Sequence, residues 1–214
     1  MGTVYEGILG KINGRVGPVV GSKWKGLNTL RSYQPKPHNP KTTAQKIQRS
    51  KFKLLVALGR KCLPFIRLSL AKAYANMSGY NAFVKINLST AISGTYPSFS
   101  INYPNLLVAT GTLTGIDTVS VANAAGRKVI LTWTDNTGEG NAASTDVGMI
   151  LLIDGSNRFM IDDTSSSVRS AGTLTLTCPL FWVGNTVYAY IAFKNPTTGE
   201  ISISSYAGTV NVLL

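Results

Sequence analysis

The sequence predicts an α+β protein: a basic N-terminal arm with a short hairpin and a kinked helix pair, followed by an immunoglobulin/fibronectin III-like antiparallel β-sandwich. Three observations lead to this prediction. Glycine and proline are frequent in the first 40 residues, a helical period runs from about residue 43 to 77, and hydrophobic residues alternate with polar ones from about residue 95 onward. We therefore expect two domains, residues 1–94 and residues 95–214.

The N-terminal arm contains six glycines between residues 7 and 26. They do not form a phosphate-binding loop, because G-x-x-x-x-G-K-[S/T] is missing and no helix is expected directly after them. Residues 19–24 and 27–33, on either side of Lys25-Gly26, are typical of two short strands joined by a turn. A glycine-rich arm that packs on a neighbouring molecule explains this pattern better than a ligand cradle does.

A helix is expected to begin after Thr42, because Thr42 and Gln45 form a capping-box pattern behind a proline-rich connector. Pro64 lacks a backbone N–H and should break this helix, which gives two helices at about 43–62 and 64–76. Apolar side chains share one side of the helical projection. The opposite side carries a narrow arc of cations: Lys46, Arg49, Lys53, Arg60 and Arg67.

The region after residue 95 is predicted to form short strands separated by turns rich in Gly, Asn, Asp and Ser. Val129, Leu131 and Trp133 alternate with residues that point the other way, as in a strand with one face in a core. Seven or more strands at this spacing are typical of a two-sheet sandwich. The expected strands are residues 98–103, 106–109, 118–122, 128–134, 147–153, 158–162, 173–178, 187–193, 201–205 and 209–213.

The net charge of +12 is distributed unevenly along the chain. Residues 1–90 contain 16 Lys and Arg residues and one acid, Glu6, whereas residues 91–214 contain five Lys and Arg residues and eight acids. The two parts therefore carry +15 and −3. A field this one-sided attracts polyanions and acidic surfaces, and the attraction should weaken with salt. A role in solubility alone stays open, although an even spread of charge would serve it equally.

The two cysteines, Cys62 and Cys178, are too few for a disulfide scaffold and fit a reducing compartment. The first residues lack the basic and apolar segments of a signal peptide. The most apolar stretch, residues 54–71, is interrupted by three cations and a proline. We therefore expect a soluble protein that is made in the cytoplasm and has no membrane contact.

Residues suited to catalysis or metal binding are scarce. A Ser-His-Asp or Cys-His arrangement would have to use the single histidine, His38, and zinc would need more closely spaced ligands. The eight C-terminal acids, which could pair for glycoside hydrolysis, fall mostly in expected turns. Residues 135–141 could hold a calcium ion, but turn formation explains their Asp, Asn and Gly equally well. We predict no catalytic residue, cofactor or metal site, and no enzyme.

The basic residues of the hairpin and helices are the strongest candidates for a functional surface. Such cations neutralise phosphates without reading sequence, and Trp24 or Tyr33 could stack on the bases of a single strand. A basic face also serves as a solvated surface or meets an acidic protein, so these alternatives stay open. The candidates for binding nucleic acid or a partner are Lys23, Trp24, Lys25, Arg31, Lys46, Arg49, Lys53, Arg60 and Arg67.

A family resemblance is carried by segments at both ends of the chain: residues 14–26, 31–32, 39–42, 44–52, 182–185, 188–193 and 205–208. They resemble an uncharacterised family, a domain of unknown function from Bacteroidota genomes and their phages and prophages, with a Gly-rich Trp-Lys-Gly arm and a C-terminal β-sandwich. The resemblance implies that the two halves belong together and that the setting is phage-like. It supplies no catalytic residues.

We expect a non-enzymatic structural or assembly protein, a component of a phage virion or phage-like particle that self-associates through its basic N-terminal module. Its partners would be further copies of the chain or other particle proteins, with contact to a DNA or RNA backbone, and its final location would be the virion. One alternative is a sequence-independent nucleic-acid-binding protein for packaging or compaction. A further alternative is a carbohydrate-binding module.

Overall fold

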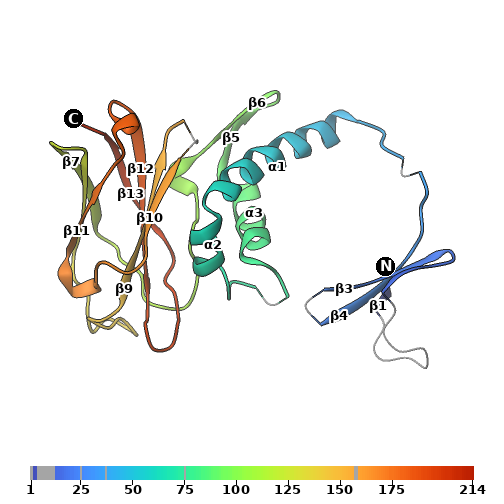
Figure 1. Ribbon diagram of the computed structural model, residues 1–214, viewed down its shortest axis with the longest axis horizontal. Helices are drawn as coiled ribbons and strands as arrows, with labels where there is room; N and C mark the ends of the chain where they lie inside the picture. The colour runs from blue at the N-terminus through green and yellow to red at the C-terminus, as the bar shows by residue number, and fades with distance from the viewer. Residues whose placement is uncertain (1, 4–12, 25, 37, 75, 157–158) are drawn as a thin grey trace. The chain divides into compact units, whose positions relative to one another are not determined.

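The computed structural model describes residues 2–3, 13–24, 26–36, 38–74, 76–156 and 159–214 (Figure 1). In this part of the chain the protein is mixed α+β, with three α-helices and several antiparallel sheets. Met1–Lys46 with Ala75–Met77 form one compact unit, and Ile47–Tyr74 with Ser78–Leu214 form a second, larger unit. This division differs from the boundary expected after residue 94, because the helices group with the strands that follow them.

The smaller unit contains a four-stranded antiparallel sheet in the order β1-β4-β3-β2. Trp24 pairs with Leu27, so the hairpin expected around residues 25–26 is confirmed, and two short strands extend it on either side. The strands are β1 (Gly2–Thr3), β2 (Gly14–Val16), β3 (Val19–Trp24) and β4 (Leu27–Ser32).

The kinked helix pair is confirmed as α1 (Thr43–Lys61) and α2 (Leu63–Ser69). Thr42 Oγ1 accepts a hydrogen bond from the Gln45 backbone N–H at 3.4 Å, as the capping pattern predicts. The two helices are separated at Cys62, and Pro64 lies in the first turn of α2, where its missing N–H is tolerated. None of the described helices is long and apolar enough to cross a membrane.

The second helix ends at Ser69, earlier than the expected residue 76. Ser69 Oγ donates a hydrogen bond to Val108 O at 2.6 Å, and Leu70 is fully buried, so the chain leaves the helix where it meets a neighbouring segment. A third helix, α3 (Gly79–Thr90), follows and was not predicted. Ser78 caps it by accepting a hydrogen bond from the Asn81 backbone N–H at 3.2 Å.

Asn87 fixes α3 to the buried segment after β6, and its replacement by alanine should destabilise the protein. The Asn87 amide donates to Leu107 O at 2.8 Å and accepts from Leu107 N at 2.8 Å, with the side chain fully buried. An alanine would leave both Leu107 groups without a partner, at a cost of about 1–3 kcal/mol. Urea unfolding followed by circular dichroism measures this loss, and Asn81→Ala, at an exposed position of the same helix, is the control. Equal stability of both variants would contradict the assignment.

The rest of the larger unit contains a β-hairpin and a β-sandwich. Two antiparallel sheets, in the orders β10-β9-β12-β13 and β11-β8-β7, face each other across one hydrophobic core. The core side chains come mainly from β8, β9 and β12, and they include Trp182 and Trp133, of which Trp133 was expected to face a core. The hairpin strands are β5 (Ile92–Thr95) and β6 (Ser98–Ile101); the sandwich strands are β7 (Val119–Ala124), β8 (Lys128–Trp133), β9 (Val147–Asp154), β10 (Met160–Asp163), β11 (Thr173–Thr177), β12 (Thr186–Lys194) and β13 (Ser205–Asn211).

Two of the expected strands are wrong. Leu106 to Ala109 is buried but irregular, because side chains satisfy its backbone: Ser204 Oγ, for example, accepts from Val108 N and Ala109 N. Ile201 and Ser202 form only isolated bridges, and β13 begins at Ser205, before the expected residue 209. The first segment leads from the β5–β6 hairpin to the sandwich, and the second lies between β12 and β13. The helices cover the second face of the β9 sheet (Figure 1).

Candidate functional site

The structure separates the candidates of the hairpin onto two faces of the small sheet. Arg31 pairs with Val20, and alternate residues of one strand share a face, so Trp24 and Arg31 lie on the same face. Lys23 lies on the opposite face. All three candidate side chains are exposed, and Lys25 lies outside the described residues.

Among its described residues, the smaller unit buries no hydrophobic side chain. Val16, Trp24, Leu27 and Tyr33 are each at least 40% exposed, and Trp24 reaches 58%. A sheet needs a covered hydrophobic face to be stable in water. The described part of this sheet therefore presents apolar surface that contact with another surface would bury.

Arg15 of β2 is a further member of this surface that the sequence did not single out. Its guanidinium carbon lies 3.6 Å from the centroid of the Tyr33 ring, and Nε donates to Gly17 O at 3.0 Å. Because Arg15 pairs with Val20, it shares a face with Trp24. One side of the Tyr33 ring is therefore occupied, which leaves Trp24 as the better of the two expected stacking residues. Arg15 and Tyr33 are far apart in the sequence, so no local pattern predicted this contact.

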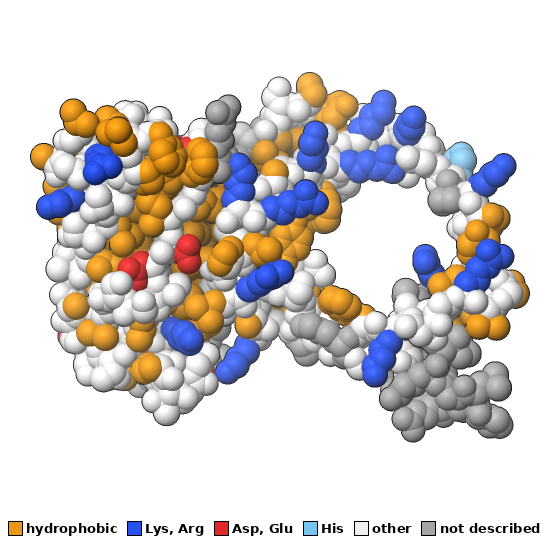
Figure 2. Space-filling model, in the orientation of Figure 1, with side chains coloured by type: hydrophobic (Ala, Val, Ile, Leu, Met, Phe, Trp, Pro, Cys, Tyr) orange, Lys and Arg blue, Asp and Glu red, His pale blue; other side chains and the backbone are white. Residues whose placement is uncertain are grey.

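The helical candidates follow the exposed sides of α1 and α2 (Figure 2). The opposite side of these helices is buried, through Leu55 and Leu58 in α1 and Phe65 and Ile66 in α2. Residues 43–90 contain no Asp or Glu, so no acid on the helices offsets their charge. The cations of this region are Lys46, Arg49, Lys51, Lys53, Arg60, Lys61, Arg67, Lys72 and Lys85.

Two apolar depressions flank the basic side of α1. The larger, of about 570 Å³, lies between α1 and α3 and is lined by Gln48, Arg49, Phe52, Lys53 and Leu88. The smaller, of about 250 Å³, lies between α1 and the β5–β6 hairpin and is lined by Ser50, Lys53, Leu54, Ala57, Pro97 and Phe99. Lys53 borders both, and the Phe52 side chain is 51% exposed.

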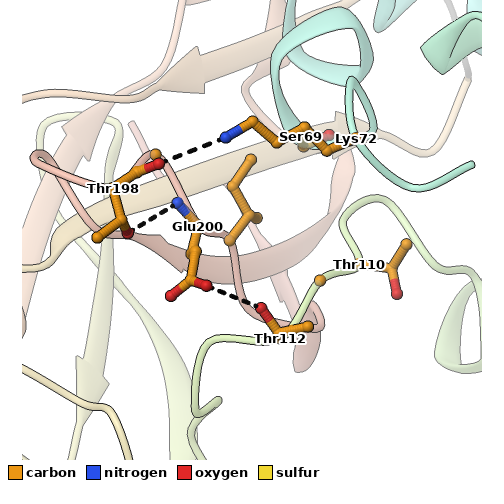
Figure 3. Close-up of a pocket in the computed structure, with 9 residues that line it drawn as sticks. Ser69, Lys72, Thr110, Thr112, Thr198 and Glu200 are labelled. Carbon is orange, nitrogen blue, oxygen red and sulfur yellow. Dashed lines mark hydrogen bonds between the residues drawn. The ribbon is translucent and has the colours of Figure 1, made fainter. Parts of the chain in front are cut away.

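A polar cavity of about 300 Å³ lies where the end of α2 meets two loops of the sandwich (Figure 3). Lys72 Nζ donates to Thr198 O at 3.3 Å, and Thr112 Oγ1 donates to Glu200 Oε1 at 3.4 Å. Both charged groups are thus bonded to the loops around the cavity and hold this junction together. None of the lining residues is aromatic, so the cavity gives no support to the carbohydrate-binding alternative.

The residues that could serve catalysis or metal binding have different surroundings. His38 is exposed in the connector before α1, and burial raises the pKa of the Cys62 thiol to about 12 and that of Cys178 to about 11. Hydrogen bonds from the Thr137 side chain and backbone lower the pKa of Asp135, whose Oδ1 accepts both. The carboxylate therefore forms a turn, as the alternative to calcium proposed. Within the described residues, no three His, Cys, Asp or Glu side chains could hold a metal ion.

A buried charge in the sandwich also escaped the sequence analysis. Arg169 is fully buried and forms an ion pair with Asp146 at 3.1 Å, and it donates to Thr114 O and Asn136 Oδ1. Its guanidinium carbon lies 4.2 Å from the Phe193 ring centroid. This network joins three loops at one end of the sandwich, so its role is structural.

A family model described as "Family of unknown function (DUF6266)" matches residues 11–208. None of the curated proteins matches the chain. Among solved structures, the chain is similar to the solution structures of the fn3 domain of human collagen alpha-1(XX) chain, with 8% sequence identity and a TM-score of 0.36. This match covers 47% of the present chain and 85% of that chain. The description of the sandwich rests on its own strands and core.

Proposed function

The chain belongs to the DUF6266 family of unknown function, and from its own surfaces we propose that it is a non-enzymatic assembly protein that docks through its N-terminal sheet. The observation that carries this proposal is the exposed apolar surface of that sheet, which has no buried hydrophobic side chain among its described residues. A contact with a further copy of the chain would bury Trp24 and Leu27, at about 25 cal/mol for each Å² of apolar area removed from water.

The setting that we propose is a phage-like particle, with copies of the chain or other particle proteins as partners. The resemblance to a phage-associated family supports this setting. The strand order supports the finer proposal that the sandwich is immunoglobulin- or fibronectin III-like, since its first, second and fifth strands form one sheet and the other four form the second. The exposed position of His38 and the two buried thiols support a function other than catalysis.

Size-exclusion chromatography with light scattering tests the docking proposal. We expect the wild-type chain to form oligomers whose mass rises with protein concentration, because burial of the sheet drives association. The double variant Trp24→Ser/Leu27→Ser should shift the midpoint of association to at least tenfold higher concentration, which corresponds to about 1.4 kcal/mol.

The matched control is Leu180→Ser/Phe181→Ser, which changes a similarly exposed Leu and aromatic residue of the sandwich. This control should associate like the wild type. A wild-type chain that stays monomeric at every concentration and salt would overturn the proposal, and so would equal weakening by the two double variants.

Nucleic-acid binding is a second candidate function, and the exposed cations of α1 and α2, two helices without an acidic residue of their own, favour it. The triple variant Arg49→Glu/Lys53→Glu/Arg60→Glu should abolish binding of mixed-sequence DNA at low salt, because each reversal replaces a phosphate contact by a repulsion. Fluorescence anisotropy at several salt concentrations measures the binding. A triple charge reversal at Arg127, Lys128 and Lys194 of the larger unit is the control for net charge. Equal losses in both triple variants would show that only the total charge matters.

A further inference from the structure

On the basic side of α1 a cation lies between two apolar depressions, and helix geometry explains this order. Phe52, Lys53 and Leu54 are consecutive, and successive helix residues are about 100° apart around the axis. Lys53 therefore lies on the exposed crest of α1, with Phe52 on the α3 side and Leu54 on the hairpin side. The result is a cation with an apolar depression on each side.

The depression toward α3 presents a flat ring at an open surface. Phe52 is 51% exposed, and Leu88 of α3 lines the same depression. The depression has a volume of about 570 Å³ and is wide open to solvent, so a flat group can reach it from outside.

The depression toward the hairpin repeats this chemistry on a smaller scale. Pro97 and Phe99 line it together with Leu54, and Lys51 Nζ lies 5.2 Å from the centroid of the Phe99 ring. Each depression thus contains one phenylalanine, and Lys53 stands between them. No acid within residues 43–90 competes for these cations.

We propose that a short stretch of single-stranded nucleic acid crosses α1 at Lys53, with its bases in the two depressions and a phosphate on the Lys53 ammonium. The alternation of apolar, cationic and apolar surface matches the alternation of base, phosphate and base along such a strand. An acidic peptide would be attracted by the same cations, but it has no flat ring to stack on Phe52. The inference rests on the second candidate function and adds to it the chemical class of the ligand.

Anisotropy titrations of the full-length chain test this site with fluorescein-labelled 12-mers of dT and of U and with a 20-base-pair duplex. The wild type should bind both single strands more tightly than the duplex, because paired bases are not available for stacking. Phe52→Ala should weaken single-strand binding about tenfold or more, with the salt slope unchanged and duplex affinity within about twofold. Lys53→Gln should weaken binding to both and reduce the salt slope by about 0.7–0.9.

Matched variants separate stacking from general effects. Phe52→Tyr keeps a flat ring and should retain affinity within about twofold, whereas Phe52→Leu keeps an apolar side chain without the ring and should behave like Phe52→Ala. Phe181→Ala removes a phenylalanine that is 59% exposed on the sandwich and should have no effect. A 12-mer of abasic sugar-phosphate should bind the wild type no more tightly than dT binds Phe52→Ala, because it lacks the bases for both depressions. Urea unfolding of each variant confirms an intact fold.

Three outcomes would overturn the inference. Equal weakening of single strand and duplex by Phe52→Ala, or no weakening of either, would remove the base contact and leave the nucleic-acid candidate standing. A poly-glutamate peptide of equal charge should compete with dT in a way that does not depend on Phe52. If Phe52→Ala weakens binding of this peptide as strongly as it weakens dT binding, the site belongs to an acidic protein. A wild-type chain that binds no strand at low salt would remove both this inference and the nucleic-acid candidate, without affecting the assembly proposal.

Discussion

Arg169→Met should cost the folded protein about 3–5 kcal/mol of stability, because it leaves a buried carboxylate without its counter-ion. Arg169 Nε and Nη2 each lie 3.1 Å from Asp146 Oδ2, and both side chains are fully buried. Apart from Arg169, the Asp146 carboxylate accepts a hydrogen bond from the Ala143 backbone N–H at 2.8 Å, and its Oδ1 atom has no hydrogen-bond partner among the described residues. A single neutral donor does not replace the lost counter-ion. The three loops that the guanidinium joins would also lose their common donor.

Urea unfolding at pH 7 measures this loss as a shift of the midpoint at unchanged slope. The control Arg127→Met removes a half-buried cation of the same unit and should change stability by less than about 0.5 kcal/mol. The double variant Arg169→Met/Asp146→Leu should recover much of the loss, because it removes both buried charges. A single Arg169 variant as stable as the wild type would contradict the described network.

Trp182→Ala should also destabilise the protein by about 3–5 kcal/mol, through the cavity that it opens in the sandwich core. Trp182 is fully buried in the cluster that both sheets share, and it is among the largest side chains there. Trp182→Phe should cost less than about 1.5 kcal/mol, since it keeps most of the volume and removes an indole N–H that has no acceptor among the described residues.

The neighbouring residue provides the control for Trp182. Phe181 lies in the same short 3-10 turn, η3 (Leu180–Trp182), but it is 59% exposed. Phe181→Ala should therefore change the stability of the dilute protein by less than about 0.5 kcal/mol. Thermal and urea unfolding that ranked Phe181→Ala as the more damaging variant would mean that the core is assigned to the wrong residues.

The parts of the fold that the sequence predicted are those with a local signal. The turn at residues 25–26 is encoded by Lys-Gly between two strand-like runs, and the break between α1 and α2 by Pro64. The alternation in residues 128–134 predicted a strand with one buried face, which β8 has. In each case a few adjacent residues are sufficient for the prediction. The backbone is restricted locally, by glycine or proline, or the side chains follow the period of a single strand.

The parts that were missed depend on contacts between distant segments. The helix α3 was not predicted because Asn87 interrupts its buried face, and this asparagine is stabilised there by hydrogen bonds to Phe83 O and to the Leu107 backbone. The strand expected at residues 147–153 is confirmed as β9, but its cover on both faces, by the second sheet and by the helices, was not predicted. The buried segment from Leu106 to Ala109 has strand-like composition, but side chains from far along the chain take the place of a neighbouring strand.

The candidate surface was predicted in composition but not in arrangement. Helical periodicity placed Arg49, Lys53 and Arg60 on an exposed side correctly, because one helix fixes their spacing. The depressions beside Lys53 need α3 and the β5–β6 hairpin, and no local pattern predicts how either of these packs against α1. Lys23 and Trp24 lie on opposite faces because successive strand residues alternate, and Arg31 shares the Trp24 face through the register of β3 and β4, which needs the structure.

Hydrogen exchange of the backbone amides in β3 and β4 as a function of protein concentration tests the central claim most directly. If the N-terminal sheet is stabilised by docking, its amides should be protected in concentrated, associated protein and should lose that protection on dilution to monomer, while the amides of β9 and β12 stay protected throughout. If light scattering shows the protein to be monomeric and the β3 and β4 amides are still as protected as in the associated protein, the account is contradicted.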